Sequence, residues 1–459
     1  MKVQTLRAAM VLLLVGSLAG CDLFTVDDES SPNGPALEDI LADPSVENLS
    51  AVALGIEAAS RVDIDLYLIN VGVIGREYWR TSAADPRFTG DLLGRGTSVL
   101  DNNTFYITRP WNARYRVVRN ANILLQLVES NAALDNAVDR LSAEEASYAR
   151  GYAKTWKAYQ YLLNLNLTFE NGLRFIDAGE EVAGPVESYA TSLAQITALL
   201  DEANGDLSGS ASFFGTTVDI TYMNRAIAAR VAAYQGDFAR VLTLLTDAFD
   251  VDGIGVGDLG SGVAHLFSTG GGDLTNPVFF PPTNAVGDAI LAHPSYANEI
   301  EQGDMRIDKV EQRLGDDGEP TVSSFDELAS QFSFFRYKSV TDAIPVTRNA
   351  ELVLLRAEAR AQTGDLAGAI ADLNTIRNAA GLSDYSGATD QSAVLDEMLR
   401  QRRYELYGEG HRWVDARRYD RLSTLPIDRQ ERTDRDGNVV EADNVWDQFP
   451  IPATENVGG

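Results

Sequence analysis

The sequence predicts a mostly α-helical fold, in which about four helix pairs stack into a solenoid with loop-rich and short β-hairpin insertions. The main observation is an internal repeat: residues 233–242 align with residues 361–370, and each copy lies between two helical patterns. Both copies carry an Ala, a Gly-Asp pair and then an apolar pair, which is how tetratricopeptide (TPR) units join their two helices with a period of about 34 residues. Such units stack and bury a shared face. Two weaker helix pairs upstream complete the expected array of four.

The second copy of the repeat shows how the sequence builds one unit. Leu352, Leu355 and Ala359 are spaced i, i+3 and i+7, so they lie on one face of a predicted helix. Gly364 can adopt the left-handed conformation that ends this helix. Asp365 can then accept a hydrogen bond from a free N–H group at the start of the next helix.

Helical patterns also cover much of the first half of the chain, at residues 48–70, 109–129, 142–167 and 188–203. The third of these begins with Ser142 and Glu145, which is the pattern of a capping box. It carries Tyr152, Trp156 and Tyr159 at spacings of four and three residues, and such an aromatic stripe is more often core than ligand site. Together with the repeat, these patterns place TPR-like helix pairs roughly within residues 45–250 and 347–380.

Between the two copies of the repeat, residues 250–345 are expected to form a loop-rich insertion, because glycines and prolines interrupt every regular pattern there. A further hairpin is expected at residues 432–440, with an Asp-Gly turn. Asp434, Asp436 and Asn438 resemble the start of a calcium-binding loop. The distal Glu that such a site needs is not at the right place, so no metal is expected.

Composition narrows the classes of function. The chain has 459 residues and a formal net charge of −29, which argues against nucleic acid as a partner because the phosphate backbone needs a basic footprint. The single cysteine, Cys21, allows neither a disulfide framework nor a CxxC metal site. Three histidines leave little room for a histidine-based metal or acid/base site. No cofactor is expected.

The N-terminus has the layout of a secretory signal. Lys2 and Arg7 precede an apolar run that is too short to span a bilayer, and Leu18-Ala19-Gly20 lead into Cys21. Small residues just before a sole cysteine resemble a lipobox, in which the cysteine becomes the diacylated N-terminus. We therefore expect a lipoprotein signal peptide at residues 1–20, lipidation at Cys21 and a flexible acidic tether at residues 21–40.

The C-terminal part of the chain carries a charged signature at residues 390–459. Arg402 and Glu405 are spaced i, i+3, as are Glu409 and Arg412, in a helix that Gly408 and Gly410 weaken or break. Together with earlier segments of the chain, the full pattern consists of Arg356-Ala357-Glu358-Ala359, Asn374 to Arg377, Ala380-Gly381-Leu382 and Arg402 to Arg418. These segments resemble the sequence signature of the SusD/RagB family of surface lipoproteins. The chain departs at Gln401, where the family usually has Glu, and at Ala416, where it usually has Leu.

The resemblance implies a single SusD-like domain at residues 41–459, with a TPR-like fold. It implies a non-enzymatic protein that is lipid-anchored at the cell outer membrane and faces the extracellular side. There it would capture oligosaccharide or peptide nutrients and deliver them to a SusC-like TonB-dependent β-barrel. The residues alone leave two alternatives open: an exported all-helical glycoside hydrolase with two carboxylates roughly 5–10 Å apart, and a TPR scaffold that binds protein partners.

A glycan site needs exposed aromatic rings beside polar groups. Two loop regions offer that mix: residues 76–88 with Asn102 and Asn103, and the insertion that holds Phe280, His293 and Tyr296. The predicted ligand-binding residues are Tyr78, Trp79 as the stacking platform, Arg80 and Asn102 as hydroxyl partners, and Tyr296. The alternative is that Tyr78 and Trp79 are core. The predicted structural signature comprises Arg402, Glu405, Glu409, Gly410, Arg412 and Asp415. Glu405, Glu409, Arg412 and Asp415 are expected to form one buried or half-buried structural network rather than a catalytic one.

The lipid anchor can be tested by replacing Cys21 with Ala. Because one diacylated cysteine on a flexible tether should hold the chain at a membrane, the Cys21→Ala protein should move to the soluble fraction when cells are fractionated and membranes are washed with salt. If the variant stays with the washed membranes, the acyl chains are not what retains it.

Overall fold

The computed structural model describes residues 37–135, 139–180, 183–209, 215–249, 251–433 and 435–456. The chain divides into two units, Met1–Pro44 and Ser45–Gly459. The described part of the first unit contains the helix α2 (Leu37–Ala42), which begins inside the stretch expected to be a flexible tether. Its first turn carries Glu38 and Asp39, which favour a helix start. The expected signal peptide and Cys21 lie outside the described residues.

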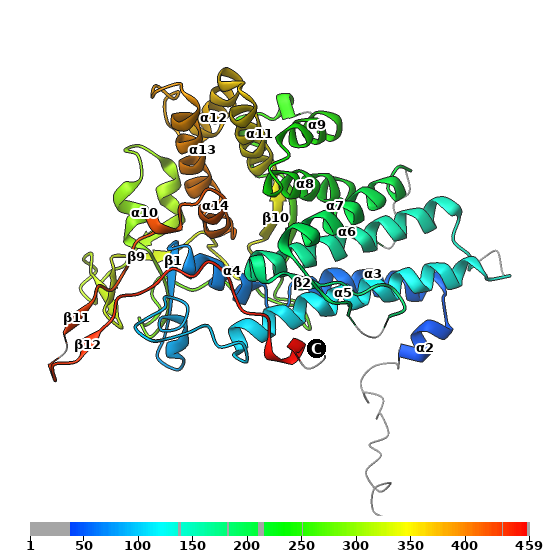
Figure 1. The fold of residues 1–459 in the computed structure, drawn as a ribbon, viewed down its shortest axis with the longest axis horizontal. Helices are drawn as coiled ribbons and strands as arrows, with labels where there is room; N and C mark the ends of the chain where they lie inside the picture. The colour runs from blue at the N-terminus through cyan, green and yellow to red at the C-terminus, as the bar shows by residue number, and fades with distance from the viewer. Residues whose placement is uncertain are drawn as a thin grey trace, which may run out of the picture. The chain divides into compact units, whose positions relative to one another are not determined.

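The second unit is mostly helical, and its helices pack in chain order (Figure 1). Nine of its described helices carry the array: α3 (Val46–Ser60), α5 (Phe105–Ala132), α6 (Ala143–Thr168), α7 (Tyr189–Asp206), α8 (Ile220–Tyr234), α9 (Phe238–Ala248), α11 (Asn349–Thr363), α12 (Leu366–Ala379) and α13 (Gln391–Glu405). The pairs α3/α5, α6/α7, α8/α9 and α11/α12 follow one another, and α9 contacts α11 across the insertion. The predicted fold class, a TPR-like array of about four helix pairs, is confirmed.

The turns within the two repeat copies have the predicted chemistry. Gly236 and Gly364 both have positive φ, 74° and 94°. The side chain of Asp237 accepts a hydrogen bond from the Arg240 N–H at the start of α9 (3.0 Å), and Asp365 accepts one from the Gly368 N–H at the start of α12 (3.0 Å). Each Asp therefore satisfies one of the N–H groups that a helix start leaves without a partner.

The helix α6 packs against α5, α7 and α8. Its start is the predicted capping box, in which Ser142 and Glu145 exchange side-chain to backbone hydrogen bonds. Tyr152, Trp156 and Tyr159 are buried, as expected for a core stripe. Because nearly every residue of α6 after Ala149 is buried, the helix packs on all sides.

A small sheet lies beside the array and holds the start of the candidate site. It is antiparallel, in the order β1 (Tyr78–Ser82), β5 (Asp288–Ala292), β9 (Phe332–Phe334) and β6 (Val310–Gln312). Trp79 pairs with Leu291 across the first two strands. This sheet was not predicted: it joins a strand in the first quarter of the chain to three strands of the insertion.

The other strands form two-stranded pairs. They are β2 (Leu173–Arg174) with β3 (Val186–Glu187), β4 (Gly262–His265) with β10 (Ile344–Arg348), β7 (Ser323–Phe325) with β8 (Leu328–Ser330), and β11 (Arg432–Thr433) with β12 (Val439–Val440). The last pair is the hairpin expected from the Asp-Gly turn. Asp434, one of the three residues that resembled a calcium-binding loop, lies outside the described residues.

The remaining described helices are short. They are α4 (Ile64–Ile74), α10 (Pro294–Glu299), α14 (Arg412–Arg418) and the 3-10 turns η1 (Pro86–Phe88), η2 (Phe169–Asn171), η3 (Val251–Gly253), η4 (Val256–Asp258), η5 (Met305–Lys309), η6 (Leu422–Thr424) and η7 (Ala453–Asn456). None of the helices formed by the described residues combines the length and apolarity needed to cross a membrane.

Candidate binding sites

Tyr78 and Trp79, two predicted ligand residues, are core residues of β1. Tyr78 is fully buried, its hydroxyl donates to the Leu68 carbonyl (2.8 Å), and its ring lies 4.6 Å from that of Phe334. Trp79 is 3% exposed, and its indole N–H donates to Asp428 (2.9 Å). Neither ring offers a face to a ligand in this structure, which agrees with the alternative interpretation that both are core.

Tyr296 and Asn102 do not line either of the pockets described below. Tyr296 is 1% exposed, its hydroxyl donates to the Arg306 carbonyl (2.8 Å), and its ring packs 4.1 Å from that of Tyr407. Asn102 is half-buried, and its backbone carbonyl accepts a hydrogen bond from Ala453 (3.0 Å). The ligand role of these residues stays a prediction.

Arg80 differs, because it lines a pocket of about 370 Å³. Its guanidinium lies 4.5 Å from the ring centre of Phe280 and 5.6 Å from that of Phe88, and it pairs with Asp288 (2.6 Å). The pocket, called the Phe280 pocket below, is lined by Asp65, Leu66, Ile69, Arg80, Asp85, Phe88, Phe105, Arg109, Pro277 and Phe280. The two predicted loop regions therefore meet here, with Phe280 rather than Trp79 as the accessible ring.

Sequence reasoning missed several lining residues of this pocket. Asp65, Leu66 and Ile69 come from α4, and Phe105 and Arg109 from the first turns of α5. The guanidinium of Arg87 lies 4.8 Å from the ring centre of Phe105. The available signal was position: Phe105 follows the predicted Asn102 by only three residues.

The charged signature folds as a helix, a turn and a second helix. The helix α13 ends at Glu405, and α14 begins at Arg412. Gly408 and Gly410 have positive φ, 74° and 86°, and a Cβ on Gly408 would lie 2.6 Å from the Phe334 ring. Because the helix breaks where glycine was expected to break it, the i, i+3 spacing from Glu409 to Arg412 no longer brings the two side chains together.

The two glutamates of the signature instead share one arginine, Arg348. Its buried guanidinium donates to Glu405 (2.8 Å) and Glu409 (2.9 Å), and also to the Glu405 carbonyl (2.6 Å). Burial alone would raise the pKa of Glu405, but the neighbouring cations Lys309 and Arg348 outweigh it and lower that pKa to about 2. We call Arg348, Glu405 and Glu409 the Arg348 network.

Asp415 and Arg402 belong to a second buried cluster. Asp415 accepts from Arg402 (2.7 Å) and Arg418 (3.2 Å), and Arg418 also pairs with Glu358. Arg412 lies outside both clusters and donates to the Arg76 carbonyl (2.7 Å). The expectation of one network containing Arg412 is therefore corrected: there are two clusters, and the turn before α14 directs Arg412 elsewhere.

Residues 329–456 match the sequence model of the SusD family. Among proteins with curated functions, none matches the sequence. A SusD-like carbohydrate binding protein from Bacteroides vulgatus has a similar solved structure, with a TM-score of 0.64 and 16% identity over 90% of this chain and 96% of that chain. The fold of the chain is SusD-like. Surface glycan-binding protein A from Bacteroides uniformis gives a TM-score of 0.66 and 16% identity over 90% and 98% of the two chains, and NanU of B. fragilis gives 0.61 and 14% over 86% and 94%.

The residues matched to the SusD family contain the Arg348 network and the rest of this SusD-like signature. The Phe280 pocket is built from residues before 329, outside the match. Within the described ranges, no three His, Cys, Asp or Glu side chains are grouped so that they could hold a metal ion.

The Arg348 network can be tested by Arg348→Ala. Removing one partner of a buried ion pair leaves a charge without compensation, so the variant should lower the free energy of unfolding by about 3–5 kcal/mol in urea unfolding followed by circular dichroism. The matched control is Arg240→Ala, because Arg240 binds both oxygens of Asp201 (2.6 and 2.7 Å) at an exposed position. The control should cost about 0–1 kcal/mol. Equal losses in the two variants would mean that the buried network contributes no more than a surface pair.

Proposed function

We propose that this SusD-like protein is a non-enzymatic cell-surface binding protein that captures oligosaccharides and delivers them to a SusC-like TonB-dependent outer-membrane transporter. The SusD-like fold supports this proposal, together with the names of two structural neighbours, a carbohydrate binding protein and a surface glycan-binding protein. Peptide is the alternative ligand. Lipidation at Cys21, after removal of a signal peptide at residues 1–20, would anchor the protein at the outer membrane on its extracellular side.

The observation that carries the ligand site is the Phe280 pocket. Sugars present apolar C–H faces edged with hydroxyls, and the half-buried rings of Phe280 and Phe105 can cover such a face. Arg80, Asp85 and Arg109 supply donors and acceptors for hydroxyl groups around them. In this proposal Tyr78 and Trp79 act behind the pocket, where their burial fixes the strand that presents Arg80.

One observation favours the glycoside hydrolase as a second candidate. Asp65 and Asp85 both line the pocket. Burial, and then the neighbouring Asp63, raise the pKa of Asp65, whereas the hydrogen bond from Arg87 is the main cause that lowers the pKa of Asp85. Two carboxyl groups with separated pKa values are the arrangement that hydrolysis of a glycosidic bond needs. Asp85, however, is held by the guanidinium of Arg87 (2.6 and 2.8 Å), which leaves it less available as a base.

The test is glycan binding by Phe280→Ala. The protein is run through affinity gels that contain a panel of polysaccharides, and the best ligand is titrated by calorimetry. Because stacking on Phe280 is the main apolar contact, the variant should bind at least about tenfold more weakly, a loss of roughly 1.4 kcal/mol. The control is Leu314→Ala, a 60% exposed residue of the same insertion that lies outside the pocket.

Unchanged affinity in a folded Phe280→Ala protein would show that the Phe280 pocket is not the glycan-binding site. The same samples are assayed for new reducing ends, and we expect none. Steady release of reducing ends that stops in Asp65→Asn would establish the hydrolase instead.

A further inference from the structure

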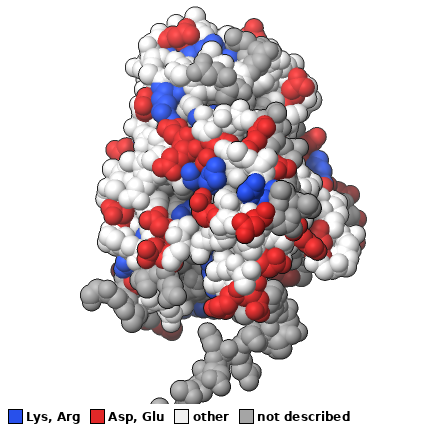
Figure 2. Space-filling view, turned by 90° about the vertical axis from the view of Figure 1, so that its right-hand side faces the viewer, with Lys and Arg blue, Asp and Glu red and all other residues white. Residues whose placement is uncertain are grey.

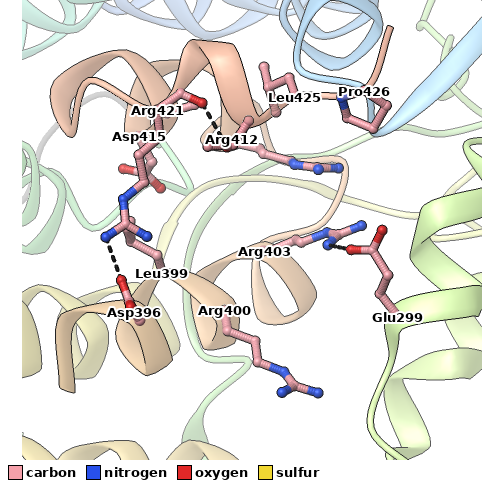
Figure 3. Close-up of a pocket in the computed structure, with 12 residues that line it drawn as sticks. Glu299, Asp396, Leu399, Arg400, Arg403, Arg412, Asp415, Arg421, Leu425 and Pro426 are labelled. Carbon is pink, nitrogen blue, oxygen red and sulfur yellow. Dashed lines mark hydrogen bonds and ion pairs between the residues drawn. The ribbon is translucent and has the colours of Figure 1, made fainter. Parts of the chain in front are cut away.

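A second pocket, of about 290 Å³, lies among α10, α13, α14 and residues 421–426 (Figure 3). Four arginines line it, Arg400, Arg403, Arg412 and Arg421. Leu399, Leu425 and Pro426 add an apolar wall. We call it the arginine pocket. It stands out in a chain of net charge −29, whose acidic side chains cover more surface than its basic ones on the face shown in Figure 2.

The carboxylates of the arginine pocket do not neutralise all four arginines. Glu299 pairs with Arg403 and Asp396 pairs with Arg421. The third lining carboxylate, Asp415, is used by Arg402 and Arg418, whose guanidinium groups do not line the pocket. Two arginines of the pocket are left over.

Arg400 and Arg412 are these two. The only carboxylate within ion-pair distance of Arg400 among the described residues is that of Glu301, at 3.9 Å, and Arg400 is 42% exposed at its side chain. Arg412 makes no ion pair with any carboxylate in the part of the chain that the structure describes, and its one hydrogen bond there goes to the Arg76 carbonyl. Glu77 and Glu299 attract Arg412 only at longer range, so the arginine pocket retains two guanidinium groups with little direct pairing.

The position of Arg412 favours an anionic occupant. Figure 3 shows its guanidinium on the same side of the pocket as that of Arg403. Burial, and then the repulsion of Arg403, lower the pKa of Arg412 to about 9, so it is still cationic at neutral pH. A guanidinium presents its N–H groups in a planar fork that matches the oxygens of a carboxylate or sulfate, and such charge-assisted bonds are among the stronger hydrogen bonds in proteins.

We propose that the arginine pocket binds a small oxyanion, a carboxylate or sulfate group, held by Arg412, with Arg400 adding positive charge on the opposite side of the pocket. Its volume lies near the lower end of the range for ligand pockets, about 300–1,000 Å³, which suits a free ion or one anionic sugar unit. Glu299 and Asp396 at the same pocket disfavour a polyanion. The arginine pocket shares no lining residue with the Phe280 pocket, so the proposal is independent of glycan capture there.

Calorimetry on the full-length protein in neutral detergent tests this. The probes are sodium sulfate, sodium glucuronate and neutral glucose, titrated at constant ionic strength. Saturable binding of sulfate alone indicates a free-ion site, and tighter binding of glucuronate indicates an anionic sugar. Glucose should give no signal that depends on Arg412. Arg412→Gln should weaken anion binding at least tenfold. Arg412→Lys keeps the charge but not the planar fork, so its affinity should lie between those of the wild-type protein and Arg412→Gln.

The decisive outcomes use a variant that leaves the buried structure intact. Arg400→Glu reverses a charge at an exposed lining position and should weaken anion binding even if Arg412→Gln fails to fold. Arg119→Glu is the matched control: it makes the same change of net charge at an exposed residue of α5 and should leave the affinity unchanged. The proposal is overturned if neither anion binds saturably to the wild-type protein, or if Arg400→Glu and Arg119→Glu bind equally well.

Discussion

The Arg348 network is the interaction on which the rest of this structure depends. Arg348 is the last residue of β10 and stands directly before α11. Its guanidinium reaches Glu405, the last residue of α13, and Glu409 in the turn that follows. The side chains of Arg348, Glu409 and Glu405 are 7%, 3% and 13% exposed, and charges with so little exposure are tolerable only when they are paired and hydrogen-bonded. The network therefore fixes the turn at residues 406–411 against the last helix pair of the array.

The turn at residues 406–411 also holds the start of β1. The Tyr407 hydroxyl donates to the Glu77 carbonyl (3.0 Å), the Gly408 N–H donates to the Glu77 carboxylate (3.3 Å), and Arg412 reaches the Arg76 carbonyl. Arg80 follows Glu77 by three residues and lines the Phe280 pocket. The same turn sets where α14 begins and so where Arg412 faces the arginine pocket. Both candidate sites thus depend on one turn that Glu405 and Glu409 hold in place through Arg348.

The sequence predicted what local chemistry decides. The Gly-Asp turns, the capping box at Ser142 and the hairpin at residues 432–440 each depend on a few adjacent residues, and the structure contains all of them. The sequence did not predict the pairing of segments that lie far apart in the chain. The sheet that joins β1 to β5 pairs residues more than 200 positions apart, and it buries Trp79 beside Asp428, from a third segment. Likewise, i, i+3 spacing favoured partners within the signature, whereas Glu409 binds Arg348, 61 residues upstream.

The measurement that tests this account most directly is the pH dependence of the stability difference between the wild-type protein and Arg348→Met. The folded-state pKa of Glu405 is lowered from 4.5 to about 2, so its contribution to stability is present above pH 4.5 and is lost as the pH falls toward 2. The account predicts that the difference in unfolding free energy is largest near pH 7 and shrinks over that interval, because protonated glutamates no longer need Arg348. A difference that stays constant from pH 7 to pH 2.5 would contradict it.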